Sequence, residues 1–151
     1  WLWDTVFSIR EAAVSNLKKL TETFGSDWCR DEIILKLLKF DSQLLENFVY
    51  RFTLLSALTA LVPVVSMEVV ADQILPFVAH LADDAVPNIR FNVSKSFAAI
   101  VEKLSQDNAA YGDTIKKSII PPLKKLNEDN DFDVQYFSKA SLEECNKILE
   151  K

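Results

Sequence analysis

The chain has 151 residues, of which 49% are hydrophobic and 26% charged, the balance of a soluble globular protein. Its net charge of −5 argues against a nucleic-acid surface, which needs a basic face. No apolar run reaches the roughly 18 residues that a membrane span needs. Only two glycines and five prolines are present, so long stretches lack turn chemistry and the sequence predicts an all-α fold.

Apolar residues at spacings of three and four predict seven helices. In chain order these are expected at about 4–24, 26–40, 47–62, 66–82, 87–104, 112–126 and 133–149, with loops at 41–46 and 105–112. Gly25 should end the first helix, and Ser26 or Asp27 should cap the second. Ser66 should cap the fourth helix, and Pro76 should kink it.

The most regular predicted helix is the fifth, which begins after Asp84. Pro87 suits its first turn, where the missing N–H costs nothing. Its apolar stripe consists of Ile89, Val93, Phe97, Ile100 and Leu104. We expect this stripe to face the core.

One pattern recurs along the chain and indicates a repeat. Arg10, Arg51, Arg90 and Gln135 occupy one register, at intervals of 41, 39 and 45 residues. Six positions before each of them stand Asp4, Leu45, Asp84 and Asp129. A helix-pair repeat of about 40–47 residues is typical of an α-solenoid.

On these residues the chain resembles the HEAT family, whose repeats combine a proline in the first helix, an acid at the turn and an arginine early in the second helix. The segments IREAAVSNLKKLTETFG, ILPFVAHLADD, NIRFNVSKSF and DFDVQYFSKASLEE resemble the C-terminal repeats of the scaffold (A) subunits of type-2A protein phosphatases. The abundance of Phe and Leu suggests a fungal member.

The resemblance implies a right-handed α-solenoid of HEAT repeats. Residues 1–25 would be the second helix of a truncated repeat. Residues 26–65 and 66–105 would be complete repeats, and 106–151 a C-terminal capping repeat whose outer side is polar. In such folds the acids and bases pair between neighbouring repeats as a ladder, here formed by Asp4, Arg10, Asp84, Arg90 and Asp129. Arg51 can reach Asp4 or Asp84, although the missing acid at position 45 favours a free, partner-facing Arg51.

The resemblance also implies a function without chemistry of its own. In these scaffolds the stacked turns between the two helices of each repeat form a ridge that holds the phosphatase catalytic subunit, while earlier repeats hold regulatory subunits. Carried over by position, Arg51 and Val86 are the first contact candidates, followed by Asn47, Pro87, Phe7 and Trp28. For each aromatic the alternative is packing against adjacent repeats, and Trp28 would equally suit a buried helix start.

Catalysis and metal binding are not expected. The single histidine, His80, and the two cysteines, Cys29 and Cys145, have no partner pattern for catalysis, and the cysteines suit small buried groups. Residues 129–133 imitate the start of a calcium loop but lack its glycine and its final acid. We therefore expect no cofactor and no metal.

Two further expectations concern assembly. A HEAT fragment would alternatively serve as an adaptor or transport module that binds peptides or helices in its concave groove. The N-terminal face, left without a preceding helix, favours a homodimer of the fragment. We expect a cytoplasmic location, with the nucleus as a second compartment.

Overall fold

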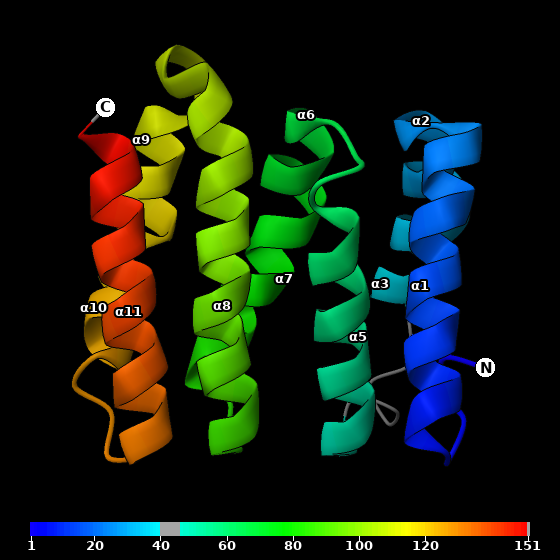
Figure 1. Ribbon diagram of the computed structural model, residues 1–151, viewed down its shortest axis with the longest axis horizontal. Helices are drawn as coiled ribbons and strands as arrows, with labels where there is room; N and C mark the ends of the chain where they lie inside the picture. The colour runs from blue at the N-terminus through cyan, green and yellow to red at the C-terminus, as the bar shows by residue number, and fades with distance from the viewer. Residues whose placement is uncertain (40–45, 151) are drawn as a thin grey trace.

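The computed structural model describes residues 1–39 and 46–150, and in these ranges it contains helices and turns but no strand. The helices stack side by side in two layers (Figure 1). The front layer consists of α1 (Phe7–Phe24), α5 (Phe48–Leu61), α8 (Pro87–Leu104) and α11 (Phe132–Leu149). The layer behind consists of α2 (Ser26–Cys29), α3 (Leu35–Leu38), α6 (Met67–Val69), α7 (Leu75–His80), α9 (Asn108–Ser118) and α10 (Ile120–Leu126). The predicted all-α solenoid of HEAT repeats is confirmed.

The starts of the front helices follow local capping chemistry. The side chain of Asn47 accepts a hydrogen bond from the backbone N–H of Val49 and caps α5, and Pro87 occupies the first turn of α8 as predicted. α1 begins at Phe7 rather than at residue 4, because Val6 is extended and its N–H donates to the carboxylate of Asp4. Gly25, with a φ of 92°, ends α1.

Two expectations about the rear layer were wrong. Ser26 does not cap the second helix, since it lies inside α2 and its hydroxyl accepts from the backbone N–H of Ser66 at 2.8 Å. The loop expected at 105–112 is only a 3₁₀ turn at Ser105–Asp107, because the Asp107 carboxylate caps α9. Ser66 caps α6 as expected. Residues 40–45, with the predicted end of the second helix, most of the loop at 41–46 and register position 45, lie outside the described residues.

The first helices of the repeats widen into π-helical turns at Arg30–Ile34 and Val70–Ile74. The second of these turns lies just before Pro76, where a kink was predicted, since proline cannot donate a backbone hydrogen bond. The first turn has the same form although Leu35 occupies the corresponding position. Proline is therefore not required for the wide turn.

The core runs between the two layers, and α8 lies at its centre with α5 on one side and α11 on the other. The five apolar residues predicted for its stripe, Ile89, Val93, Phe97, Ile100 and Leu104, are each 0% exposed. The prediction for this helix is confirmed.

The outer side of α1 is apolar and open. Ile9, Leu20 and Phe24 are 39%, 41% and 58% exposed, and Trp1 beside them is 89% exposed. None of the described helices is long and apolar enough to cross a membrane. The division into four repeat segments stays a prediction.

Candidate protein-interaction site

The N-termini of α1, α5, α8 and α11 lie along one edge of the molecule, at the bottom of Figure 1. The described turns that lead into them are residues 3–7, 46–48, 83–88 and 127–132, which together we call the turn ridge. This arrangement follows from the common direction of the four front helices. Residues equivalent in the repeat therefore lie side by side on the ridge.

Aspartates at equivalent positions shape three of these turns. The carboxylates of Asp4, Asp84 and Asp129 each accept a hydrogen bond from the backbone N–H two residues later, at 2.8, 2.9 and 2.9 Å. Each contact folds the chain just before its helix begins. In the last turn Asp131 adds a second cap, because its carboxylate accepts from the N–H groups of Asp133 and Val134. The acidic run at 129–133 is thus a helix-capping device.

Arginines from the first turns of the helices hold the same loops. Nη1 of Arg10 and of Arg90 donates to the backbone carbonyl of Asp4 and of Asp84, both at 2.8 Å. Nη1 of Arg51 donates to the carbonyl of Glu46 at 2.9 Å. Gln135 makes the equivalent contact to the carbonyl of Asp129 through its amide.

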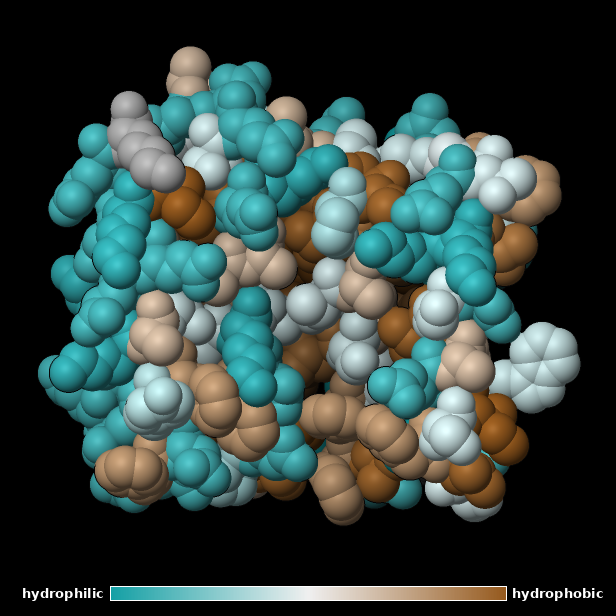
Figure 2. Space-filling model, viewed as in Figure 1, coloured by the Kyte–Doolittle hydropathy of each residue, from teal (hydrophilic) through white to brown (hydrophobic). Residues whose placement is uncertain are grey.

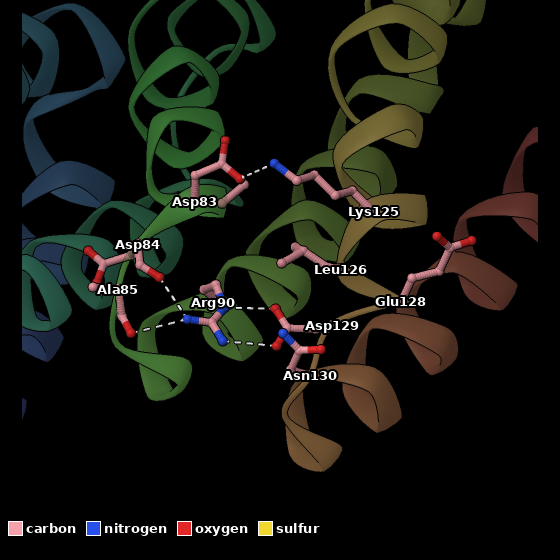
Figure 3. Close-up of a pocket in the computed structure, with 10 residues that line it drawn as sticks. Asp83, Asp84, Ala85, Arg90, Lys125, Leu126, Glu128, Asp129 and Asn130 are labelled. Atoms are coloured by element: carbon pink, nitrogen blue, oxygen red, sulfur yellow. Dashed lines mark hydrogen bonds and ion pairs between the residues drawn. The ribbon is translucent and has the colours of Figure 1, made fainter.

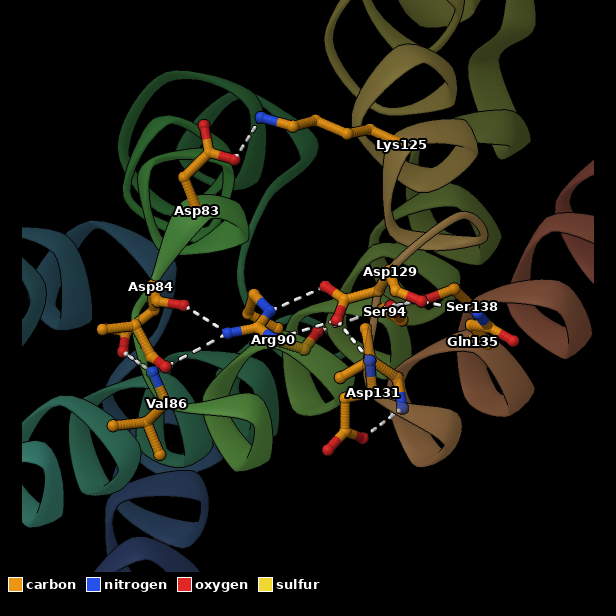
Figure 4. A network of polar contacts seen from close by, with 12 residues as sticks. Asp83, Asp84, Val86, Arg90, Ser94, Lys125, Asp129, Asp131, Gln135 and Ser138 are labelled. Atoms are coloured by element: carbon orange, nitrogen blue, oxygen red, sulfur yellow. Dashed lines mark hydrogen bonds and ion pairs between the residues drawn. The ribbon is translucent and has the colours of Figure 1, made fainter.

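Two arginines also bind the acid of the next repeat, and Figure 4 shows one of these pairs, Arg90 with Asp129. Arg51 donates from Nε and Nη2 to Asp84 at 2.6 and 3.0 Å, and Arg90 donates from the same two nitrogens to Asp129 at 2.8 and 2.9 Å. Both arginine side chains are 17% exposed, and the two aspartates are 5% and 12% exposed. These bidentate pairs are the rungs of a ladder between repeats. The expectation that the missing acid at position 45 leaves Arg51 free was wrong, because its acid comes from the following repeat.

The rungs lower the pKa of both carboxyl groups. For Asp84, burial alone would raise the pKa, but hydrogen bonds from Arg51 and from the backbone N–H of Val86 outweigh it and the net shift is downward. For Asp129 the hydrogen bond from Arg90 lowers the pKa, against a smaller opposing effect of burial. Both side chains are therefore charged well below neutral pH.

Sequence reasoning missed the hydroxyl contacts that join the front helices above the rungs. Ser94 and Ser138 lie 2.6 Å apart between α8 and α11, and both are fully buried. Thr59 and Ser96 lie 2.7 Å apart between α5 and α8. The only signal in the sequence is a small polar residue beside an otherwise apolar stripe, as Ser94 is beside Val93.

A depression of about 480 Å³ opens on the ridge between the last two described turns (Figure 3). Most of its charged lining is paired, since Lys125 contacts Asp83 at 2.6 Å, Arg90 contacts Asp129 and Asp84 binds Arg51. Glu128, which also lines it, makes no ion pair among the described residues. No group of three His, Cys, Asp or Glu side chains that could hold a metal occurs among the described residues. This depression is therefore a feature of surface shape with one unpaired carboxylate, that of Glu128.

The ridge exposes apolar side chains. Phe7, Phe48 and Phe132 are 58%, 49% and 78% exposed, and Val86 and Pro87 beside them are half-buried. Figure 2 shows brown and tan side chains gathered on the lower part of the front face, which is the part nearest the turns. Aromatic and apolar side chains that are exposed in the free protein often become the buried core of a protein–protein interface.

Of the six predicted contact residues, five lie on or beside the ridge and one does not. Asn47 is exposed there, although its amide oxygen caps α5. Trp28 lies at the opposite edge, in α2 at the top of Figure 1, where its ring packs 4.8 Å from that of Phe24. Trp28 therefore leaves the set of ridge contacts, and it is partly buried in α2 rather than fully buried.

The three side chains considered for catalysis are dispersed. His80 is exposed on α7, whereas both cysteines are buried. Burial raises the pKa of the Cys145 thiol to about 11, and burial also raises the pKa of Cys29 against a hydrogen bond from Thr21. Both thiols thus stay protonated at neutral pH and pack as small apolar groups, as predicted.

Comparison with known proteins places the chain in a family. The sequence model described as "PIK3R4-like, middle domain" matches residues 34–145, about three quarters of the chain. The chain belongs to this PIK3R4-like middle-domain family.

Two similar fungal proteins are named as phosphatase subunits. The chain is 68% identical over 132 residues to the regulatory A subunit of protein phosphatase PP2A from Saccharomyces cerevisiae, a match that covers 87% of the chain and 21% of that protein. It is 46% identical over 84 residues to the protein of the same name in Schizosaccharomyces pombe, a match that covers 56% of the chain and 13% of that protein. The chain thus spans about a fifth or less of these relatives. The predicted resemblance to fungal phosphatase scaffold subunits is confirmed.

A double-mutant cycle of Arg90→Ala and Asp129→Ala should give a coupling energy of about 2 kcal/mol, because the pair is bidentate and largely buried. Urea unfolding of the four proteins measures it. The matched control is Lys125 with Asp83, an ion pair whose side chains are 71% and 72% exposed, for which we expect less than about 1 kcal/mol. Equal coupling in the two cycles would contradict a special role for the rung.

Acid should weaken the ladder. Because the pKa of Asp84 and of Asp129 is lower in the folded chain than in the unfolded one, the unfolded chain takes up these protons first. The stabilisation is complete above the ordinary aspartate pKa of about 3.9 and is lost as the pH falls through the folded-state values. Urea unfolding over an acidic pH series should show a smaller acid loss for Asp129→Asn than for the parent. Asp83→Asn is the control, and a slope unchanged by Asp129→Asn would refute the assignment.

Proposed function

We propose that this chain is a non-catalytic scaffold segment whose turn ridge binds the catalytic subunit of a type-2A protein phosphatase and so helps to assemble the heterotrimeric serine/threonine phosphatase. The names of the two relatives support the class of partner. The observation that carries the proposal is the row of exposed apolar side chains on turns that are held by internal ion pairs. The relatives are much longer than this chain, so the proposal concerns one segment of such a scaffold.

The turns are suited to binding because their backbone is already ordered. The carboxylates of Asp84 and Asp129 hold their own turns and also receive the arginine of the preceding repeat. A surface ordered before association loses little conformational entropy when a partner binds. The free energy gained by burying the exposed apolar side chains of the turns then contributes to the affinity.

The contact candidates take different roles on this ridge. Val86 and Pro87 lie at the start of α8, where proline stiffens the chain, and they are the best apolar anchors. Arg51 acts mainly through the turn that it holds, because its Nε and Nη2 already bind Asp84. Phe7 and Asn47 extend the surface toward α1 and α5.

We propose the remaining partners and the location as well. We place the regulatory subunits on repeats outside these 151 residues and the assembly in the cytoplasm, with the nucleus as a second compartment. The scaffold would contribute selectivity by joining an enzyme to a targeting subunit, and no catalytic step is assigned to it.

Charge placed on the ridge should weaken binding of purified type-2A catalytic subunit. Val86→Asp and Phe132→Asp should each lower the affinity by about tenfold or more, because an apolar anchor becomes a charge that must be desolvated. Both positions suit aspartate locally, since Val86 is the N-cap of α8 and Phe132 is the first residue of α11. Isothermal titration calorimetry measures the affinities.

Phe24→Asp is the matched control for this titration, because Phe24 is an exposed aromatic at the far end of α1. It should bind as the parent does. Equal losses at all three positions, or no loss at the two ridge positions, would refute the ridge as the binding surface. Absence of binding by the parent would show that these residues do not suffice.

We further propose that the outer side of α1 mediates a homodimer of this chain, since Ile9, Leu20 and Phe24 form an open apolar face there. Light scattering after size exclusion should show a mass that rises with concentration. Ile9→Asp should restore the monomer, whereas the control Lys19→Asp should not. A monomeric parent over a wide concentration range would disprove the dimer.

A further inference from the structure

A groove runs between α5 and α8 on the front face, away from the turn ridge, and consists of two hollows. The first, of about 310 Å³, lies over the middle of both helices and is lined mainly by small or apolar side chains, among them Phe52, Leu55, Ser56 and Ala60. The second, of about 190 Å³, lies at their upper ends, where the lining includes Val62, Pro63 and Ala99. Figure 2 shows the centre of the front face hollowed in this region.

The two hollows belong to one groove because the same stripe of α8 lines both. Asn92, Lys95 and Ser96 line the first hollow, and Ala99 and Lys103 line the second. These residues follow one another at spacings of three and four, so they lie on one face of the helix. The groove therefore extends along α8.

The polar groups on the floor of the groove already have hydrogen-bond partners. The hydroxyls of Thr59 and Ser96 lie 2.7 Å apart, and each also lies within hydrogen-bond distance of a carbonyl of its own helix. The amide nitrogen of Asn92 donates to Asn88. An extended segment would bury its own N–H and C=O groups here without partners, whereas a helix satisfies them internally. The groove therefore favours a helical occupant.

Lys95 places a positive charge at the wall of the first hollow. Its Nζ lies 4.9 Å from the centre of the Phe91 ring and 4.0 Å from that of the Phe137 ring, and the two rings are stacked. Aromatic faces attract a cation but do not neutralise it. Lys95 forms no ion pair within residues 1–39 and 46–150. The charge is thus held in place and left available to a carboxylate.

Lys103 places a second positive charge two turns farther along α8, about 12 Å along the helix axis. Its Nζ donates to the backbone carbonyl of Pro63 at 3.2 Å, and it too forms no ion pair in the described part of the chain. Glu102 is the one acid among the described residues that line the two hollows. The groove is therefore basic, although the whole chain has a net charge of −5. Its charge is complementary to an acidic ligand.

We propose that the α5–α8 groove binds one amphipathic helix of a partner protein, which lies along α8. The helix turns an apolar stripe toward the two hollows and carries two carboxylates about two turns apart, one next to Lys95 and one next to Lys103. This surface is separate from the turn ridge. The inference therefore goes beyond the proposed binding of the phosphatase catalytic subunit.

The test begins with random peptides of 16 residues, displayed on phage and selected against the intact chain. Enriched peptides should share apolar residues at spacings of three and four and two acids seven or eight positions apart. A synthetic peptide of the enriched sequence is then titrated by fluorescence polarisation. Proline at its centre should lower the affinity by about tenfold or more, because proline breaks a helix. A harmless proline would indicate an extended occupant and overturn the proposal.

Charge reversal tests the role of Lys95. Lys95→Glu should lower the affinity for the peptide by about tenfold or more, and a peptide in which lysine replaces the facing acid should regain affinity for this variant. Lys116→Glu is the matched control, because Lys116 is exposed on α9 in the rear layer; it should bind the peptide as the parent does. Equal effects of the two variants, or no effect of Lys95→Glu, would refute the site.

Filling the first hollow tests its role in binding. Ser56→Trp should lower the affinity by about tenfold or more, since Ser56 is exposed in the groove, whereas Ala109→Trp on α9 should not. Circular dichroism should confirm that each variant is folded. Failure to enrich peptides, enrichment without the acid and apolar pattern, or affinity indifferent to Ser56→Trp would each overturn the proposal. Val86→Asp should bind the peptide unchanged, so this proposal and the phosphatase proposal can fail separately.

Discussion

The bidentate pair between an arginine of one repeat and an aspartate of the next is the constraint on which the turn ridge depends. Apolar packing between the layers favours contact, but it is non-directional and tolerates small shifts of one repeat along another. The pair is directional. Arg90 holds the carbonyls of its own turn with Nη1 and the acid of the following turn with Nε and Nη2. One side chain thus sets the spacing of two neighbouring turns, and in a solenoid each repeat contacts only its neighbours.

This constraint also explains why the ridge can carry apolar side chains outward. The polar groups of the turns are satisfied within the ladder, through Asp84, Asp129 and the caps at Asn47 and Asp131. The turns therefore need no polar side chain at positions 48 and 132, where Phe48 and Phe132 are exposed.

The two ends of the ladder differ from its middle. Gln135 keeps the contact to its own turn but lacks a guanidinium, whereas Arg10 holds its own turn and makes no ion pair among the described residues.

Periodicity predicted much of this fold, because the stripe of α8 and the repeated register reflect local helix geometry and burial. It did not predict the direction of the rungs. Arg51 and Asp84 are 33 residues apart in the sequence, and Arg90 and Asp129 are 39 apart. From the repeat alone, an arginine could pair with the acid of the preceding repeat or with that of the following one. Only the packing of the helices decides between the two. Trp28 was predicted on the ridge by resemblance. However, α1, which has 18 residues and precedes Trp28, leads from the ridge to the opposite edge of the molecule. The Ser94–Ser138 contact was invisible because it depends on the spacing between α8 and α11.

The low pKa values of Asp84 and Asp129 bear on how a scaffold of this kind works. An arginine stays charged at all physiological pH values, and these acids remain ionised far below neutrality. The ladder therefore keeps its geometry across the pH range of the cell, and partial burial limits screening by salt. The proposed scaffold role would need a fixed spacing of the turns more than a response to pH. The ladder provides that spacing wherever both members are present, as in the pairs of Arg51 with Asp84 and of Arg90 with Asp129.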